Sequence, residues 1–401
     1  MSSIYIHWPF CLSKCYYCDF NSIPQTGKIN FIQWYRLYCN VLTEFKRRFY
    51  KNEDITSVYF GGGTPSLLPV WFISDFIDNV QKEFRLTPDA EITLEVNPKT
   101  IDKIKAMELK EAGVNRLSIG VQSIIDEDLK MLGRIHTSEE AKRCVFDMRE
   151  VFSNISIDMI YNRPNQKIAT WEEELIQVLN FPINHISAYE LIVEDNTKIK
   201  KMIDSGNVKS PSDSDEFFKK TLKIMQNTGF DMYEVSNFAK DGALASSVCG
   251  GGPVWFNIQV YHAAPPPIPY GRHNISYWKY EDYYGVGPGS HSRVSVNNKK
   301  IAIEQPQDSA KWMIWGENPI FNEEPLSEDD EFKERVIMGL RFKGGINLNK
   351  FTESAKNKYD IKNKLKSLEE NSYIITDDEY VALTYSGIMK LNLVIRYLTK
   401  E

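Results

Sequence analysis

Short apolar runs alternate with longer amphipathic segments over about the first 190 residues. Runs of strand length lie near 3–7, 56–60, 91–96, 116–121, 155–160 and 185–191, and segments with helical spacing lie near 29–50, 70–85, 100–113, 137–152, 170–180 and 213–228. Strands that alternate with helices are typical of a parallel sheet built from βα units. We therefore expect an α/β fold with six such units, fewer than the eight of a complete barrel.

The rest of the chain follows other patterns. We expect the region from about 190 to 310 to be rich in loops. Within it, residues 243–271 contain a triple glycine and a triple proline, and a structureless stretch of this length is unusual inside a compact domain. We interpret 243–271 as an insertion. From about 331 the order helix, helix, two short strands, helix predicts a small winged-helix-like α+β domain.

Three of the six cysteines, Cys11, Cys15 and Cys18, lie close together directly after the first predicted strand. Thiolates favour iron–sulfur clusters and zinc, and three of them leave one iron of a [4Fe–4S] cluster open. Two alternatives remain. A structural zinc would need a fourth ligand such as His7 or Asp19, and the spacing also fits one face of a buried helix. The alternating pattern before the triad favours a strand that runs into a loop.

Glycine and polar residues gather near the carboxyl ends of the other predicted strands. Gly61-Gly62-Gly63-Thr64 follows the second strand, Glu95 ends the third, Gln122 follows the fourth and Asp158 lies in the fifth. Ligands of such sheets bind at these ends. Glycine lets a ligand approach the backbone, and a carboxylate accepts hydrogen bonds from an amine or a ribose. Tight turns and structural salt bridges are the ordinary alternatives.

Composition and charge narrow the function classes. The net charge of −6 and the pI near 5.7 argue against a nucleic-acid partner, which would favour a basic surface. No apolar run reaches the roughly 18 to 20 residues of a membrane span, and the first residues resemble a strand more than a signal peptide. Cys39, Cys144 and Cys249 are isolated, so we expect no disulfide framework and a cytoplasmic protein.

The spacing C-x3-C-x2-C, with an aromatic residue before the third cysteine, resembles the signature of the radical S-adenosylmethionine (radical SAM) superfamily. Segments 5–11, 61–66, 94–98, 115–123 and 132–136 narrow the resemblance to its anaerobic coproporphyrinogen III oxidase-like family. The resemblance implies a partial (β/α)6 barrel in which Cys11, Cys15 and Cys18 hold a [4Fe–4S] cluster and SAM occupies the open iron. The residues implied to line the SAM site are Tyr5, Phe20, Gly62, Gly63, Thr64, Glu95, Gln122, Arg134 and Asp158.

Two features separate the members of this family. The dehydrogenases have a fourth cysteine two positions after the third, where this chain has Phe20, as the heme chaperones do. The segment from His273 to Trp278 matches the HNxxYW motif of the chaperones, which is associated with heme binding. A histidine is a common axial ligand of heme iron, and aromatic rings offer apolar faces to a porphyrin. The resemblance therefore predicts heme contacts at His273, Asn274, Tyr277 and Trp278.

The resemblance implies a heme chaperone that binds a [4Fe–4S] cluster, SAM and heme and passes heme to an acceptor protein, with a homodimer as one assembly to test. The alternatives are a radical SAM coproporphyrinogen III dehydrogenase, which decarboxylates porphyrinogen propionates, and an inactive protein whose insertion has spoiled the site. The implied domains are a barrel (1–240), the insertion (243–271), a heme-motif segment (272–310) and a C-terminal domain like that of the family (320–401).

The chain departs from the family after the fifth predicted strand. Relatives usually have Gly-Leu-Pro-Gly-Gln there, and this chain has Asn162-Arg163-Pro164-Asn165-Gln166. The loss of both glycines predicts a more restricted backbone beside the SAM site.

Overall fold

Six parallel strands form the centre of the fold. The computed structural model describes residues 1–211, 214–240, 270–377 and 379–400. The neighbouring parallel strands are β1 (Ser2–Trp8), β4 (Asp54–Gly62), β5 (Arg85–Val96), β6 (Arg116–Gln122), β7 (Ile155–Tyr161) and β8 (His185–Glu190). Their apolar runs are continuous because both faces of the sheet are covered, and all residues of β6 are buried. The predicted α/β partial barrel is confirmed.

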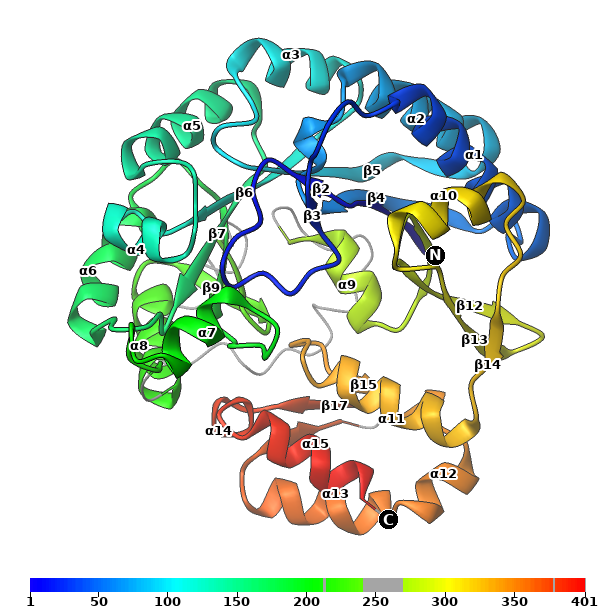
Figure 1. The fold of residues 1–401 in the computed structure, drawn as a ribbon. Coiled ribbons are helices and arrows are strands. Elements are labelled where there is room, and N and C mark those ends of the chain that lie inside the picture. The colour runs from blue at the N-terminus through cyan, green and yellow to red at the C-terminus, as the bar shows by residue number, and fades with distance from the viewer. Residues whose placement is uncertain (212–213, 241–269, 378, 401) are drawn as a thin grey trace.

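Helices cover the outside of this ring of strands (Figure 1). Those that the sequence predicts are α1 (Phe31–Arg48), α2 (Val70–Glu83), α3 (Lys103–Glu111), α5 (Ser138–Val151), α6 (Ile168–Leu179) and α8 (Ser214–Asn227). In α1 the buried residues Trp34, Leu37, Tyr38 and Val41 recur at helical spacing and face the core. The shorter helices α4 (Asp126–Met131) and α7 (Lys198–Asp204) were not predicted, because short helices carry little periodic signal.

The expectation of a loop-rich region up to residue 310 is wrong for the described residues 270–310. Strand β11 (Asp282–Val286) pairs in parallel with β1, and an antiparallel run continues the sheet beyond it. That run contains β12 (His291–Val296), β13 (Lys299–Glu304) and β14 (Glu323–Pro325), while β10 (Asn237–Lys240) and β9 (Phe230–Glu234) extend the opposite edge. These strands are short and half polar, and distant parts of the chain pair with them, so local periodicity does not reveal them.

The sheet thus includes strands that lie outside the predicted barrel segment, 1–240. Helix α10 (Ser309–Glu317) also joins the main core, where Trp312 stacks on Trp34 with ring centroids 5.4 Å apart. The predicted insertion, 243–271, lies outside the described residues except for Tyr270 and Gly271.

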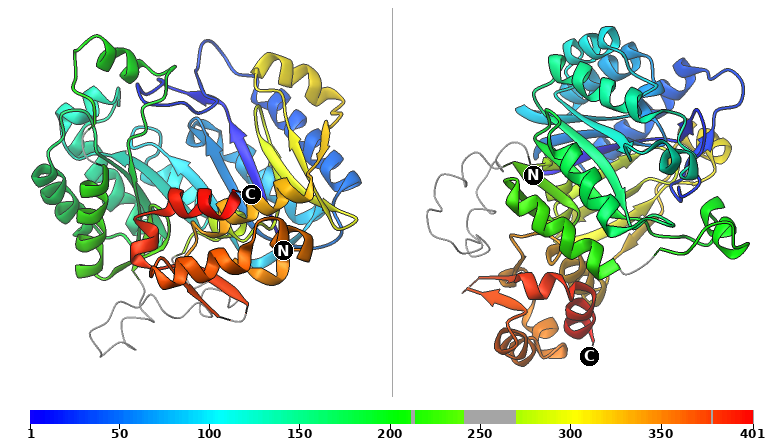
Figure 2. Two further views of the ribbon diagram at one scale, coloured as in Figure 1. Left: turned by 90° about the horizontal axis from the view of Figure 1, so that it is seen from below. Right: turned by 90° about the vertical axis from the view of Figure 1, so that its left-hand side faces the viewer.

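A small α+β domain with its own core follows (Figure 2). It contains α11 (Glu328–Gly339), β15 (Ile346–Asn347), α12 (Glu353–Lys358), α13 (Ile361–Glu370), β16 (Ile374–Thr376), β17 (Tyr380–Leu383), α14 (Tyr385–Ile388) and α15 (Leu391–Thr399). Its strands form a separate sheet in the order β15-β17-β16. The predicted C-terminal domain is confirmed, but β15 was not predicted, and the single helix expected after the two strands is two helices, α14 and α15.

Helix α9 (Arg272–Trp278), which carries the HNxxYW motif, lies inside the ring of strands (Figure 1). Ser276 Oγ donates to Ser3 Oγ (3.0 Å) on β1, and His273 Nδ1 bonds Ser57 Oγ (2.9 Å) on β4. Both serines lie in the amino-terminal halves of their strands. Helix α9 therefore fills the amino-terminal end of the ring, and the cysteine loop lies at the opposite end. No helix among the described residues is long and apolar enough to cross a membrane.

Candidate cofactor site at the carboxyl ends of the strands

A cavity of about 450 Å³ lies at the carboxyl ends of the parallel strands and extends into the ring. Its volume is in the range of small-molecule sites. The predicted residues that line it are Cys11, Cys15, Cys18, Phe20, Gly62, Gly63, Thr64, Glu95, Gln122, Arg134 and Asp158. The structure thus brings together every predicted cluster and SAM residue except Tyr5.

The triple glycine lets the cysteine loop approach the second strand closely. Gly63 N donates to Trp8 O (2.6 Å), and Thr64 N donates to Phe10 O (2.9 Å). A Cβ atom on Gly63 would lie 2.8 Å from Phe10 O and 3.0 Å from Cys11 Sγ. Any side chain at position 63 would therefore displace the first cysteine of the triad.

A second loop holds the middle of the cysteine segment. Tyr16 N donates to Leu132 O (2.9 Å), and the Tyr16 ring covers Gly133, whose φ is +73° and whose Cβ would lie 2.5 Å from that ring. The next residue, Arg134, donates from Nη1 to Cys15 Sγ (3.3 Å) and from Nη2 to Gly120 O (2.6 Å). This guanidinium therefore holds Cys15 beside a positive charge at the edge of the cavity.

The arrangement of the thiols fits a cluster better than a zinc ion that uses His7. The His7 ring nitrogens already bond Tyr5 Oη (3.1 Å, Nδ1) and Asn21 O (2.8 Å, Nε2). Among the described residues, no three His, Cys, Asp or Glu side chains meet at a point suited to a single metal ion. Three thiols around one side of an open cavity suit an iron–sulfur cluster, which is larger than a single zinc ion. When such a cluster is bound by three thiolates, one of its irons is open to a further ligand.

Two half-buried carboxyls, those of Glu95 and Asp158, lie deeper in the cavity. Glu95 accepts a hydrogen bond from Tyr59 Oη (2.8 Å), and burial raises the pKa of its carboxyl to about 7. Asp158 accepts from Ser118 Oγ (3.1 Å), and burial raises its pKa as well. Both groups present oxygen atoms that can accept hydrogen bonds from the amine or ribose of a ligand.

Tyr5 does not line the cavity, contrary to the prediction. It lies in the middle of β1, below the carboxyl end of that strand, and its ring packs near Tyr59 and His273, with centroids 6.1 and 6.2 Å away. Its hydroxyl bonds His7 Nδ1. Tyr5 can support His7 beneath the cysteine loop, and it does not contact the cavity itself.

The expectation of a restricted backbone after the fifth strand is wrong. Asn162 and Asn165 replace the two glycines, and both adopt positive φ, +53° and +63°. Asparagine is among the few residues other than glycine that tolerate this left-handed region. The turn therefore keeps a glycine-type backbone without glycine.

Arg163, in the same turn, is a residue whose role the sequence did not indicate. Its side chain is fully buried and forms ion pairs with Glu174 and with Asp128 (2.8 Å). It also donates to the backbone oxygen of Gln122 (3.2 Å), whose φ is +68°. An arginine paired with a glutamate 11 positions away, on the following helix α6, gives no periodic signal in the sequence, although an arginine in an apolar segment requires a partner.

The four predicted heme residues do not form one site in this structure. Asn274 faces the cysteine-lined cavity, whereas Trp278 lines a second cavity of about 540 Å³ between the barrel and the C-terminal domain. Tyr277 Oη bonds His273 Nε2 (2.8 Å). The motif residues of helix α9 therefore point to different places: Asn274 to the cysteine-lined cavity, Trp278 to the second cavity, and His273 and Tyr277 to each other.

His273 is not available to heme iron in this state. Its side chain is 2% exposed, its Nδ1 bonds Ser57 Oγ (2.9 Å), and its Nε2 bonds Tyr277 Oη. Burial lowers the pKa of the imidazole to about 3, so the ring is neutral. Because both nitrogens have protein partners, ligation of iron would require α9 to move. The sequence could not show this burial, since Ser57 lies 216 positions away.

A parallel barrel with three thiols and SAM-type residues at its open end defines a radical SAM fold. Residues 5–176 match the family model of the radical SAM superfamily, and residues 326–389 match the model of the HemN C-terminal domain. The crystal structure titled "Coproporphyrinogen III oxidase (HemN) from Escherichia coli is a Radical SAM enzyme" superposes with a TM-score of 0.79 at 19% identity, and the match covers 100% of this chain and 90% of that one. This likeness shows the fold.

Sequence relatives narrow the assignment. The chain is 30% identical to the mitochondrial radical S-adenosyl methionine domain-containing protein 1 of Danio rerio, over 100% of this chain and 87% of the relative. It is 32% identical to the heme chaperone HemW of Escherichia coli (75% and 72% covered) and 29% identical to that of Bacillus subtilis (96% of both). The chain belongs to the radical SAM family that includes the HemW proteins.

Proposed function

We propose that this protein is a heme chaperone, which binds heme and passes it to an acceptor protein in the cytoplasm. The observation that carries the proposal is the similarity to proteins named heme chaperone HemW, which covers 96% of both chains for the Bacillus subtilis protein and 75% and 72% for the Escherichia coli protein. Phe20 supports it, because a phenylalanine stands where the dehydrogenases of the family have a fourth cysteine.

The cavity supports a [4Fe–4S] cluster and SAM as resident cofactors. Cys11, Cys15 and Cys18 face one space, and Glu95 and Asp158 offer oxygen atoms farther inside. In the proposal, Arg134 holds Cys15 in place, and its positive charge lowers the cost of gathering thiolates at this end of the barrel. The cluster and SAM then bind at the carboxyl ends of the strands.

Heme ligation by His273 stays a prediction, and it needs a second state of the protein. In the described state Ser57 and Tyr277 occupy both ring nitrogens. Release of α9 from the amino-terminal end of the ring would free the imidazole, and it would also uncover Asn274 and Trp278. The proposal of heme binding does not depend on this particular ligand.

A heme titration tests the function. We expect anaerobically purified protein with its cluster to shift the Soret band of added heme and to lose that heme to an apo-acceptor such as apomyoglobin. The His273→Ala variant shows whether His273 supplies a ligand. A Soret position that differs between the variant and the wild type would mean that His273 binds the iron, which requires the state in which α9 is released. No Soret shift in the wild type would overturn the chaperone proposal.

A second arm tests the alternative enzyme. The reduced protein is incubated with SAM and coproporphyrinogen III, and the products are analysed for decarboxylated porphyrinogen. We expect none above the level of a Cys15→Ser control. Vinyl products that depend on SAM and on Cys15 would favour the dehydrogenase instead.

A further inference from the structure

The cysteine-lined cavity has a second end, at the floor of the barrel. Gln122 and Arg116 both line it, and they are the last and first residues of β6. At a strand rise of about 3.3 Å per residue they lie roughly 20 Å apart along the strand. The cavity therefore reaches from the cluster loop to the amino-terminal ends of the strands, where Asn274 of α9 also lines it.

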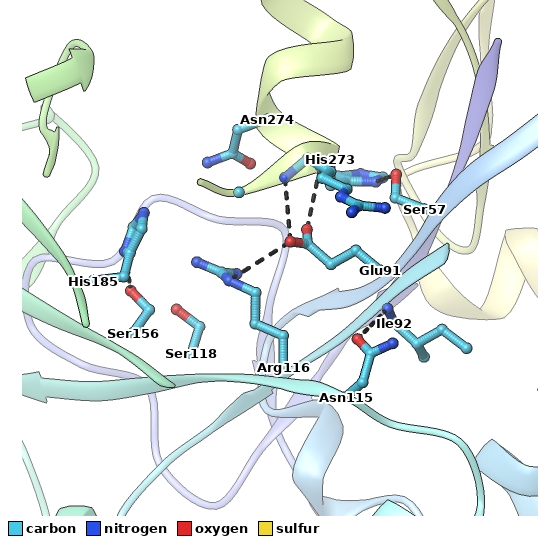
Figure 3. Close-up of polar contacts among 12 residues, drawn as sticks. Ser57, Glu91, Ile92, Asn115, Arg116, Ser118, Ser156, His185, His273 and Asn274 are labelled. Atoms are coloured by element: carbon cyan, nitrogen blue, oxygen red, sulfur yellow. Dashed lines mark hydrogen bonds and ion pairs between the residues drawn. The ribbon is translucent and has the colours of Figure 1, made fainter. Parts of the chain in front are cut away.

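Arg116 carries a buried positive charge at this floor with few partners. Its residue is 3% exposed, its Nε has no hydrogen-bond partner, and its nearest counter-charge is Glu91 Oε2, 4.0 Å from Nε. No hydrogen bond joins its guanidinium to another described residue. Figure 3 shows the guanidinium pointing between Asn274 and His185. A buried guanidinium with unpaired N–H groups is costly unless something accepts them.

Glu91 is already shared with the motif helix. Its Oε2 accepts from Arg272 N (3.2 Å) and its Oε1 accepts from His273 N (3.3 Å) (Figure 3). These contacts hold both carboxylate oxygens toward α9. The ion pair between Glu91 and Arg116 is therefore long, 4.0 Å from Oε2 to Nε, and no hydrogen bond joins the two side chains, which leaves the outer guanidinium nitrogens to the cavity.

The other acids nearby do not supply a close anion. Burial raises the pKa of Glu234 to about 8 and that of Asp158 above its usual range. Glu234 accepts from Asn274 Nδ2 (3.1 Å), and Asp158 accepts from Ser118 Oγ. Neither carboxyl forms an ion pair with the guanidinium among the described residues, and burial favours the neutral form of both, although Glu234 Oε2 is itself buried without a hydrogen-bond partner. The floor thus keeps one fixed positive charge that faces the cavity.

We propose that Arg116 binds a carboxylate of a second ligand, which lies between the floor and the SAM site. A guanidinium matches a carboxylate with two parallel hydrogen bonds. SAM is an unsuitable source, because the thiols and Arg134 place it at the far end of the cavity. The identity of the ligand rests on the proposed function: the carboxylate is a propionate side chain of the tetrapyrrole.

Matched porphyrins test this assignment on the full-length protein with its cluster. Coproporphyrin III carries free carboxylates, and its tetramethyl ester does not, so fluorescence titration with each isolates the carboxylate. We expect the wild type to bind the acid about tenfold or more tightly than the ester. We expect Arg116→Met to remove this preference while its affinity for the ester stays unchanged.

Two further variants separate binding from folding. Glu91→Gln removes the competing charge and keeps the side-chain shape, so we expect it to tighten acid binding by roughly threefold or more. If the Arg116–Glu91 pair had only a structural role, both Arg116→Met and Glu91→Gln would weaken porphyrin binding. Arg272→Gln is the matched control, because its guanidinium contacts Asp89 (2.9 Å) outside the cavity, and it should leave both affinities unchanged.

The outcomes distinguish this proposal from the function on which it rests. Equal affinity for acid and ester in the wild type, or a preference that persists in Arg116→Met, overturns the Arg116 assignment even if heme binds. An Arg116-dependent preference without any heme binding overturns the chaperone and keeps the carboxylate site. Binding of neither porphyrin overturns the Arg116 assignment, and the heme titration then decides the function alone.

Discussion

The two ends of the barrel cavity differ in how their polar groups are satisfied. At the rim, the loop 11–20 leaves its thiols facing open space, and Phe20 is 62% exposed. At the floor, helix α9 buries His273 to 2% exposure and bonds both its nitrogens. Arg116 Nε and Glu234 Oε2 are buried there without a hydrogen-bond partner among the described residues. At both ends, the groups available to a ligand are those that face the cavity with part of their bonding capacity unused.

The largest expected effect is loss of the cluster at the rim in the Cys15→Ser variant. We expect the variant to lose the cluster almost completely, because two thiolates do not hold it. Iron and sulfide analysis after anaerobic reconstitution measures this, with roughly four irons per chain in the wild type. Cys39→Ser is the control, since Cys39 lies in α1 and should keep the cluster. One zinc per chain in place of iron would contradict the assignment.

The next effect concerns the buried ion pair beneath the rim. We expect Arg163→Met to lower the free energy of unfolding by about 3 to 5 kcal/mol, because it leaves Glu174 charged and unpaired. The double variant Arg163→Met, Glu174→Leu should recover much of that loss. Urea unfolding measures both. Equal losses in the single and double variants would show that the pair itself does not explain the effect.

At the floor, His273→Ala should cost about 1 to 3 kcal/mol of unfolding free energy, since Ser57 and Tyr277 lose a buried partner. The cluster content should not change. Tyr277→Phe removes only one of the two bonds, so its cost should be smaller, about 0.5 to 1.5 kcal/mol. Unchanged stability in His273→Ala together with an altered heme spectrum would mean that α9 rests elsewhere in solution.

The smallest expected effect is a pH dependence at the floor. Burial raises the pKa of Glu234 to about 8 from its ordinary value of 4.5, so the folded state binds a proton that the unfolded state releases between these values. Stability therefore falls as pH rises through this window, by at most about 1.4 kcal/mol per pH unit from this group. Urea unfolding at about pH 6 and about pH 7 should show a flatter dependence for Glu234→Gln. An unchanged slope would assign the dependence to other groups.

The periodicity of apolar residues predicted the strands and helices that each bury a continuous apolar face. The six parallel strands and six of the outer helices follow from runs of apolar residues, because each buries a continuous face. The later strands β11 to β14 were missed, because their pairing partners are distant and their own residues are half polar. The gathering of Cys11, Glu95 and Asp158 followed from a rule of topology, since carboxyl ends of parallel strands meet at one edge.

The contacts of His273 and Arg116 could not be predicted from the sequence. The sequence predicts a heme contact at His273, which belongs to a motif, and indicates no role for Arg116, which begins an apolar strand. Their partners, Ser57 and Glu91, lie on other strands. That both ring nitrogens of His273 are bonded, and that the Arg116 guanidinium has an ion pair but no hydrogen bond, depends on those distant contacts.

The sequence by itself determined the parallel barrel, the cysteine triad and the family, because spacing within a short segment is preserved in any fold. Only the tertiary structure decided that α9 closes the floor, that His273 is engaged on both nitrogens and that Arg116 faces the cavity with no hydrogen bond to its counter-charge, Glu91. Hydrogen-bond satisfaction of a buried group depends on neighbours from the whole chain, and only the folded chain brings those neighbours together.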